Sequence, residues 1–181
     1  MGRKIRPRKK NIGILTFHDG FNCGAFLQAF SLQETIKSLG FSPQIINYKS
    51  AHHKYYEYRF LFITRRPRIF FGNIKKYFKF KGAHKLFNLS KSLNKKSGLA
   101  SLRYDAVIYG SDEIWNYSNK IVGIDPVYFG EGMELTNKIS YAPSCGNLDV
   151  KNDIPMLLQD GLRSFSSISV RDINSRNIVQ K

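Results

Sequence analysis

The sequence has few cysteines, no long apolar run and, over one long stretch, almost no acidic side chains. Its two cysteines, Cys23 and Cys145, are too few for a disulfide framework or a cysteine zinc site, so we expect a reducing, cytoplasmic environment and no metal. A transmembrane helix is not expected, because no run of about 18 apolar residues occurs. The apolar run Ile12 to Leu15 after the basic N-terminus is too short for a signal-peptide core.

The acidic residues are unevenly distributed. Residues 49–104 hold fifteen Lys or Arg and a single acid, Glu57, and residues 1–10 hold six Lys or Arg and no acid. The remainder holds eight bases and twelve acids, so the net charge of +16 belongs to a tail and one internal segment. With 181 residues the chain can form one domain with a core. We expect a basic tail at 1–10 and an α/β domain at 11–181 that carries a basic aromatic helical insert at about 50–101.

The hydrophobic pattern outside the insert alternates between strands and helices. The first strand is predicted at 11–17, followed by a turn with two glycines and a helix at 25–39 that ends before Gly40. Further predictions are strands at 44–48, 105–109, 138–142 and 167–170, an extended piece at 127–129, and helices at 83–93, 152–165 and from 174 onward. This order favours an α/β fold with a mainly parallel, Rossmann-like sheet flanked by helices.

The most informative stretch is the end of the strand at 105–109. The apolar run stops at Gly110, and a polar cluster follows that contains Ser111, Asp112, Glu113, Trp115 and Asn116. In open α/β sheets ligands bind at the carboxyl ends of the strands, so this layout is typical of a ligand-binding edge. Ser111 and Asp112 could hold a sugar hydroxyl or cap a helix, and capping is the commoner role. Trp115 could stack on a sugar or anchor the core, and its residue type alone favours the core.

Two other loops follow predicted strands. The loop at 20–24 leads into a helix, so its backbone amides and Asn22 could bind an anion, or Asn22 could simply cap the helix. His18 and Asp19 could act as an acid/base group and its orienting partner, although turn chemistry is more usual for such a pair. The loop at 141–146 also brings small residues to a strand end, and its cysteine is expected to be an unreactive packing residue.

The basic aromatic segment admits three interpretations. It could be a helical subdomain that buries its aromatic side chains and leaves Lys and Arg in water. It could bind an anionic membrane surface, or it could bind nucleic acid through phosphate contacts and stacking. We rank them in that order, because no nucleic-acid motif accompanies the charge.

Several ordered pieces of the chain resemble the polysaccharide pyruvyl transferase family. They are G-I-L-T-F-H-D-G-F-N-C-G-A at 13–25, I-N-Y at 46–48, Y-D-A-V-I-Y-G-S-D-E-I-W-N at 104–116, K-I-S-Y-A-P-S-C-G at 138–146 and S-V-R-D at 169–172. The G-S-D-x-x-W-N piece is the most specific of them.

The resemblance implies one half of a GT-B-type two-domain transferase. It implies transfer of a pyruvyl group from phosphoenolpyruvate to a sugar of a bacterial surface polysaccharide, which forms a pyruvate ketal and needs no cofactor. The expected partners are a sugar or lipid-linked glycan acceptor and an anionic membrane at its inner, cytoplasmic face. The alternatives that stay open are a nucleotide-sugar-dependent glycosyltransferase and a non-enzymatic basic adaptor for membrane or nucleic acid.

The resemblance also implies a set of site residues. By matching position, the substrate-binding residues are Asn22, Gly24, Ala25, Gly110, Ser111, Asp112, Trp115, Asn116, Tyr141, Ser144 and Arg171. The candidate catalytic residues are His18, Asp19 and Asp112. Family members run to roughly twice this length, as two domains of typical size require. We therefore expect a truncated or N-terminal half whose C-terminal domain is absent, which needs that half or a partner subunit and is inactive alone.

Overall fold

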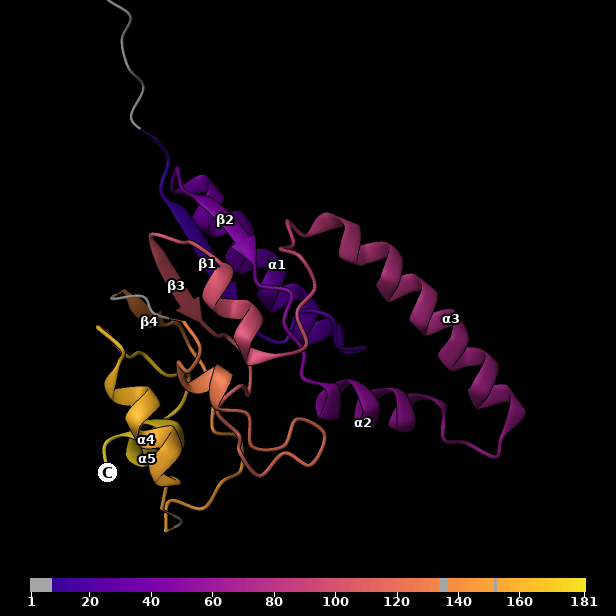
Figure 1. The fold of residues 1–181 in the computed structure, drawn as a ribbon. Coiled ribbons are helices and arrows are strands. Elements are labelled where there is room, and N and C mark those ends of the chain that lie inside the picture. The colour runs from indigo at the N-terminus through magenta and orange to yellow at the C-terminus, as the bar shows by residue number, and fades with distance from the viewer. Residues whose placement is uncertain (1–7, 134–136, 152) are drawn as a thin grey trace, which may run out of the picture.

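A computed structural model describes residues 8–133, 137–151 and 153–181 (Figure 1). Residues 1–7 of the predicted basic tail and residue 152 of the predicted helix at 152–165 lie outside the described residues. The strands are β1 (Asn11–Leu15), β2 (Ser42–Ile45), β3 (Ala106–Tyr109) and β4 (Lys138–Ser140). They form a parallel sheet in the order β2-β1-β3-β4. This arrangement confirms the predicted α/β class with a parallel, Rossmann-like sheet.

Helices connect and flank the strands. They are α1 (Cys23–Ser38), α2 (Ala51–Phe62), α3 (Pro67–Ala83), α4 (Met156–Arg163) and α5 (Ile173–Val179), with 3-10 turns η1 (His84–Leu86), η2 (Lys96–Ser101) and η3 (Pro126–Phe129). Asn22 immediately precedes helix α1, and its side-chain oxygen accepts a hydrogen bond from the Gly24 amide at 2.8 Å. Asn22 therefore acts as the helix cap. None of the helices in the described ranges is long and apolar enough to cross a bilayer.

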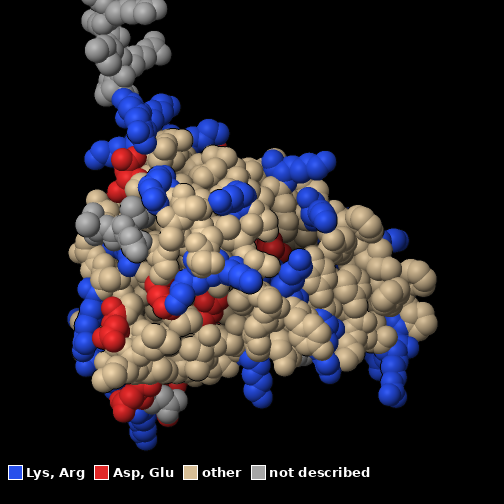
Figure 2. Space-filling view, viewed as in Figure 1, with Lys and Arg blue, Asp and Glu red and all other residues tan. Residues whose placement is uncertain are grey.

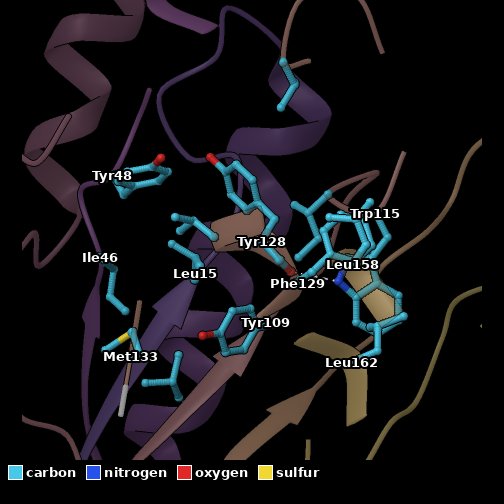
Figure 3. Close-up of a cluster of buried hydrophobic side chains, with 14 of the residues drawn as sticks. Leu15, Ile46, Tyr48, Tyr109, Trp115, Tyr128, Phe129, Met133, Leu158 and Leu162 are labelled. Carbon is cyan, nitrogen blue, oxygen red and sulfur yellow. Dashed lines mark hydrogen bonds between the residues drawn. The ribbon is translucent and has the colours of Figure 1, made fainter. Parts of the chain in front are cut away.

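Both faces of the sheet are covered, which explains the apolar runs of its central strands β1 and β3. Ile12 and Ile14 of β1 pack with α1 in one core cluster. Leu15 of β1 and Tyr109 of β3 lie in a second, larger cluster on the opposite face. Figure 3 shows this second cluster, in which Trp115 lies beside side chains of α4.

The segment after α3 differs from the prediction. A helix was predicted at 83–93, but beyond η1 the chain runs extended beside β2. Leu89 forms a bridge with Ile45, Leu93 forms one with Tyr48, and the Ser90 amide donates to the Ile45 carbonyl at 2.9 Å. The helix prediction was wrong because β2 has an open edge whose backbone groups need partners, and this segment supplies them.

Three smaller predictions also need correction. Residues 127–129 are not extended, because Asp125 caps the Val127 amide at 3.1 Å and η3 forms instead. The predicted strand at 167–170 makes a single bridge, Ser167 to Ile139 beside β4, and forms no regular strand. Helix α4 begins only at Met156, because Pro155 immediately precedes it and has an extended backbone.

The packing of α4 predicts where stability resides. Leu158 of α4 is fully buried, whereas Leu27 of α1 is 58% exposed. Leu158→Ala should lower the free energy of unfolding by about 2–5 kcal/mol, because it leaves a cavity in the larger cluster. The matched change Leu27→Ala should cost less than about 0.5 kcal/mol. Urea denaturation followed by circular dichroism compares the two, and equal losses would contradict this account of the core.

Candidate functional site

A cavity of 470 Å³ lies at the carboxyl ends of β1, β2 and β3. Parallel strands end at the same edge of a sheet, so the loops that follow them converge there. The lining residues come from the loop after β1, the start of α1, the chain after β2, helix α2, the loops after β3, and η3. They are Thr16, Phe17, Asp19, Gly20, Phe21, Asn22, Ala25, Tyr48, Lys49, His53, Glu57, Leu61, Asp112, Glu113, Asn119, Ile121, Val122 and Tyr128.

A charge cluster centred on Lys49 joins three of these elements. The Lys49 ammonium lies 2.5 Å from the Asp19 carboxylate and also pairs with Glu57 of α2, and its side chain is only 10% exposed. Burial opposes ionisation of Asp19, but Lys49 outweighs it and holds the pKa of Asp19 below its usual value. At Glu57 burial dominates and raises the pKa of the carboxyl. The cluster ties the β1 loop, the end of β2 and α2 into one wall of the cavity.

His53 is a buried polar side chain with an unused nitrogen. It is 6% exposed, and its Nδ1 atom has no hydrogen-bond partner among the described residues. Its ring packs edge-on against Phe17 at 5.4 Å. Burial, followed by repulsion from Lys49, lowers the pKa of His53 to about 4. The ring is therefore neutral at pH 7, and its edge at the cavity wall can form a hydrogen bond with a ligand hydroxyl.

Asp112 occupies an unusual backbone position at the end of β3. Its φ of 82° lies in the left-handed region that non-glycine residues rarely adopt. Its carboxylate accepts a hydrogen bond from the Glu113 amide at 2.8 Å, and burial raises its pKa. Just before it, Gly110 leaves no room for a side chain, because a Cβ atom would lie 2.3 Å from the Tyr141 carbonyl oxygen. The strand end is thus packed so that Asp112 turns into the cavity with an elevated proton affinity.

The cavity is acidic and aromatic. Four carboxylates line it, those of Asp19, Glu57, Asp112 and Glu113, together with one lysine, Lys49. Its aromatic lining consists of Phe17, Phe21, Tyr48 and Tyr128. Carboxylates accept hydrogen bonds from hydroxyl groups, and aromatic faces pack against the C–H faces of sugar rings. This composition suits a neutral, hydroxyl-rich ligand better than an anion.

Four of the predicted site residues line this cavity, namely Asp19, Asn22, Ala25 and Asp112. The structure therefore brings the first and second loops together at one edge of the sheet. Two other predicted site residues, Gly24 and Ser111, form hydrogen bonds that fix these loops. The Gly24 amide donates to the Asn22 cap at 2.8 Å. The Ser111 hydroxyl donates to Gln28 of α1 at 3.1 Å, and its carbonyl accepts from Thr16 at 2.7 Å.

Two of the predicted residues lie in the interior instead. Trp115 is fully buried, and its indole N–H donates to the Tyr128 carbonyl at 2.9 Å (Figure 3). It is a core anchor and offers no face to a sugar. His18 is 1% exposed, and its two ring nitrogens lie 3.2 Å from the Thr16 carbonyl and from the Asn47 side-chain oxygen. Its hydrogen bonds hold the β1 end to the chain after β2.

The loop at 141–146, the third loop, and its neighbours lie next to the cavity without lining it. The Ser144 hydroxyl donates to Asp172 at 2.7 Å, and Tyr141 is 55% exposed at the surface. Arg171 lies 3.9 Å from Glu113, and Asn116 donates to the same carboxylate at 3.3 Å. Glu113 therefore links these residues to the cavity that it lines.

Cys145 of the third loop is an unreactive packing residue, as the sequence predicts. It is buried, and burial raises the pKa of its thiol to about 11. A thiol that stays protonated at pH 7 is a poor nucleophile. Within the described ranges, no group of three or more His, Cys, Asp or Glu side chains is arranged to hold a metal ion.

Among the charged and histidine side chains that line the cavity, the sequence analysis did not single out Lys49, His53 and Glu57 as site residues. Lys49 directly follows the second predicted strand, so the rule that singled out the other two strand ends could have found it. His53 and Glu57 are four residues apart and share one face of α2. Glu57 is also the single acid among residues 49–104, and an isolated carboxylate in such a stretch is a signal in itself.

A second cavity of 850 Å³ lies on the other side of Lys49. It shares Asp19, Phe21 and Lys49 with the first cavity and is otherwise walled by α2, α3 and the chain beside β2. Its charged lining includes Lys54, Lys81 and Lys85. The two cavities therefore have opposite charge character on either side of one buried lysine.

The sequence of the chain matches the family model of polysaccharide pyruvyl transferase over residues 22–181. The chain belongs to the polysaccharide pyruvyl transferase family. The matched range contains α1, the Lys49 cluster except Asp19, and the whole second and third loops. No curated protein matches the chain.

Among solved structures, the chain is similar to one described as "Crystal Structure of T5 D15 Protein Co-crystallized with Metal Ions". The two share 11% identity over 94% of this chain and 88% of that chain, with a TM-score of 0.34. A likeness this weak carries no argument about the fold or the activity of this pyruvyl transferase family member.

The Lys49 cluster predicts a pH-dependent stability defect. Lys49→Met leaves Asp19 and Glu57 facing each other without a cation, so it should lower the free energy of unfolding at pH 7.5 by about 3–5 kcal/mol. Burial then raises the pKa of both carboxyls, so protonation should relieve much of this deficit at pH 5. Urea denaturation at the two pH values measures it.

Lys37→Met is the matched control, because Lys37 forms an exposed pair with Glu34 on α1. It should change stability by less than about 1 kcal/mol at either pH. The triple variant K49M/D19N/E57Q should recover part of the loss. A K49M defect that is small, or equal at both pH values, would rule out the cluster as an organising contact.

His53 predicts a second pH effect of defined sign. Its pKa in the folded chain is lowered to about 4, below the usual value near 6.5, so the fold favours the neutral ring. The stability contribution is present above pH 6.5 and is lost as the pH falls from about 6.5 to 4. The His53 ring signals, assigned by comparison with His53→Gln, should not shift between pH 8 and 5 in an NMR titration. A midpoint above pH 6 would contradict the burial argument.

Proposed function

We propose that the chain acts in the transfer of a pyruvyl group from phosphoenolpyruvate to a sugar of a surface polysaccharide, and that its 470 Å³ cavity binds the acceptor sugar. Membership of the polysaccharide pyruvyl transferase family supports the reaction class. The observation that supports the cavity's role is its lining, which contains four carboxylates, several aromatic rings and one lysine whose charge is balanced by two ion pairs.

The reaction needs proton transfers but no net acid or base. The methylene carbon of phosphoenolpyruvate accepts a proton and becomes a methyl group, which leaves a cation at the adjacent carbon. One sugar hydroxyl adds to this carbon and loses its proton, and a second hydroxyl then displaces phosphate. Of the two hydroxyl protons, one balances the new methyl group and the other leaves with phosphate. A proton donor and a proton acceptor in one cavity are therefore sufficient.

Asp112 is the residue that we assign to both proton transfers: it donates a proton to the methylene carbon and, once ionised, accepts the proton of the attacking hydroxyl. Asp112 has a raised pKa, which favours a carboxyl that holds and donates a proton. His53 has a neutral ring at the cavity wall and a low pKa, so it can hold the acceptor hydroxyl by a hydrogen bond without taking its proton. Asp19 and Glu57 are held ionised or hydrogen-bonded by Lys49, so they can orient hydroxyl groups without taking part in the chemistry.

The donor requires more positive charge than this cavity offers. Phosphoenolpyruvate carries a carboxylate and a phosphate, whereas Lys49 is the one Lys or Arg among the described residues that line the cavity, and it is already paired twice. We propose that cations facing the cavity from another domain or a partner subunit hold the donor. Transfer by the isolated chain is then not expected, although acceptor binding is.

Saturation-transfer NMR on the purified chain tests the acceptor site. Pyranosides with neighbouring free hydroxyls should show saturation transfer, and Glu57→Gln should weaken their binding about 5- to 10-fold, as expected for loss of one hydrogen bond. Glu34→Gln, which removes an exposed carboxylate on α1, is the control and should have no effect.

Competition with a nucleotide sugar, followed by an assay with phosphoenolpyruvate, distinguishes the possible activities. A nucleotide sugar that displaces the pyranoside from the wild-type chain would favour a glycosyltransferase and contradict the proposed function. Incubation of the chain with phosphoenolpyruvate and the bound sugar should release no phosphate and give no ketal methyl signal. Turnover by the chain alone would refute the division between acceptor and donor sites.

A further inference from the structure

Helices α2 and α3 with their connecting turn, residues 51–83, form a hairpin that projects from the body of the molecule (Figure 1). Its connecting turn at 63–66 lies at the outer end of the projection. None of the seventeen residues of α3, all of which have a described backbone, is buried. The hairpin therefore presents a large surface that the rest of the described chain does not cover.

The hairpin hides some aromatic side chains and exposes others. Tyr58 and Tyr77 pack against Phe21 near its base, with ring centroids 6.0 and 5.8 Å away. In contrast, Ile63 of the turn and Phe71 and Phe78 of α3 are 62%, 62% and 67% exposed. A solvated subdomain would bury such side chains, so the first of the three interpretations of this segment does not account for them.

Basic side chains surround these apolar ones. Arg65 and Arg66 lie in the turn, and neither the turn nor α3 contains an acidic residue. On α3, positions 68, 71, 75 and 78 follow one another at helical spacing, so Arg, Phe, Lys and Phe alternate along one face. In Figure 2 the charged side chains at the projecting end of the molecule are Lys and Arg, and uncharged surface lies between them.

We propose that the turn and the outer face of α3 dock on an anionic lipid bilayer, with apolar side chains inserted and Lys and Arg at the phosphate level. Amphipathic helices bind membranes by this combination of apolar burial and attraction to anionic lipids. Aliphatic Ile63 and Ile69, 62% and 44% exposed, favour lipid over nucleic acid, because they offer no ring for base stacking. The positive charge complements the surface of an anionic leaflet.

Docking in this way would place the 470 Å³ cavity close to the membrane. His53 and Glu57 line that cavity from the first part of α2, and the docking turn follows the last residue of the same helix. A helix of twelve residues is about 18 Å long. The inference itself rests on the hairpin surface and does not depend on the proposed function.

Sedimentation with lipid vesicles tests the attraction. The full chain should bind vesicles of phosphatidylglycerol and phosphatidylcholine, and should bind pure phosphatidylcholine at least tenfold more weakly. The variants R65Q/R66Q/R68Q and F71S/F78S should each weaken partition at least about tenfold. The matched controls are K91Q/K95Q/R103Q and L27S/I124S, which change exposed residues outside the hairpin and should reduce partition less than threefold.

Tryptophan quenching tests the insertion. The native Trp115 is fully buried, so Phe71→Trp adds a distinguishable fluorophore. Brominated lipids in anionic vesicles should quench Phe71→Trp and leave Leu27→Trp unchanged. Because the Phe71→Trp variant retains all charges, binding of this variant without quenching would show that the attraction is purely electrostatic.

Three results would overturn the proposal. One is no binding to anionic vesicles at low salt, with folding verified by circular dichroism. Another is binding without quenching of Phe71→Trp, or with equal losses in the control variants. The third is binding of a single-stranded oligonucleotide together with absence of vesicle binding, which would assign the surface to nucleic acid.

Discussion

The pairing of β1 with β2 on one side and β3 on the other is the constraint on which the site depends. Because all three strands run parallel, the loops that follow them must leave the sheet at one edge. Asn22, Lys49 and Asp112 are distant in sequence and line a single cavity for this reason. Burial of both sheet faces stabilises this register, since a shift by one residue would turn Leu15 away from its cluster.

Charge then distinguishes the two hollows beside that edge. Lys49 neutralises part of the carboxylate cluster and separates an acidic, aromatic cavity from a larger one with a basic rim. An acidic cavity accepts the hydrogen bonds of hydroxyl groups, and it disfavours a ligand with a phosphate and a carboxylate. The same helix that contributes His53 and Glu57 leads outward to the exposed basic hairpin. Helix α2 thus connects the cavity to the exposed basic surface.

Part of this arrangement could be predicted from the sequence. The continuous apolar runs of β1 and β3 identify strands covered on both faces, and parallel strands oblige Asn22 and Asp112 to meet. The residue type of Trp115 favours the core, and the structure confirms this, because the ring is fully buried and its indole N–H donates to the Tyr128 carbonyl. His53 and Glu57 were missed because only tertiary packing brings their helix back to the sheet edge. The extended path of residues 87–93 was missed because it is determined by backbone pairing with the open edge of β2, and not by the spacing of the segment's own apolar residues.

Amide chemical-shift mapping with a bound pyranoside tests the central claim most directly. The acceptor-site account predicts that resonances of the loop at 19–25, of Lys49 and His53, and of Asp112 and Glu113 shift together and saturate with one dissociation constant. Shifts confined to the loop at 141–146 or to α3, with none at these three elements, would contradict it.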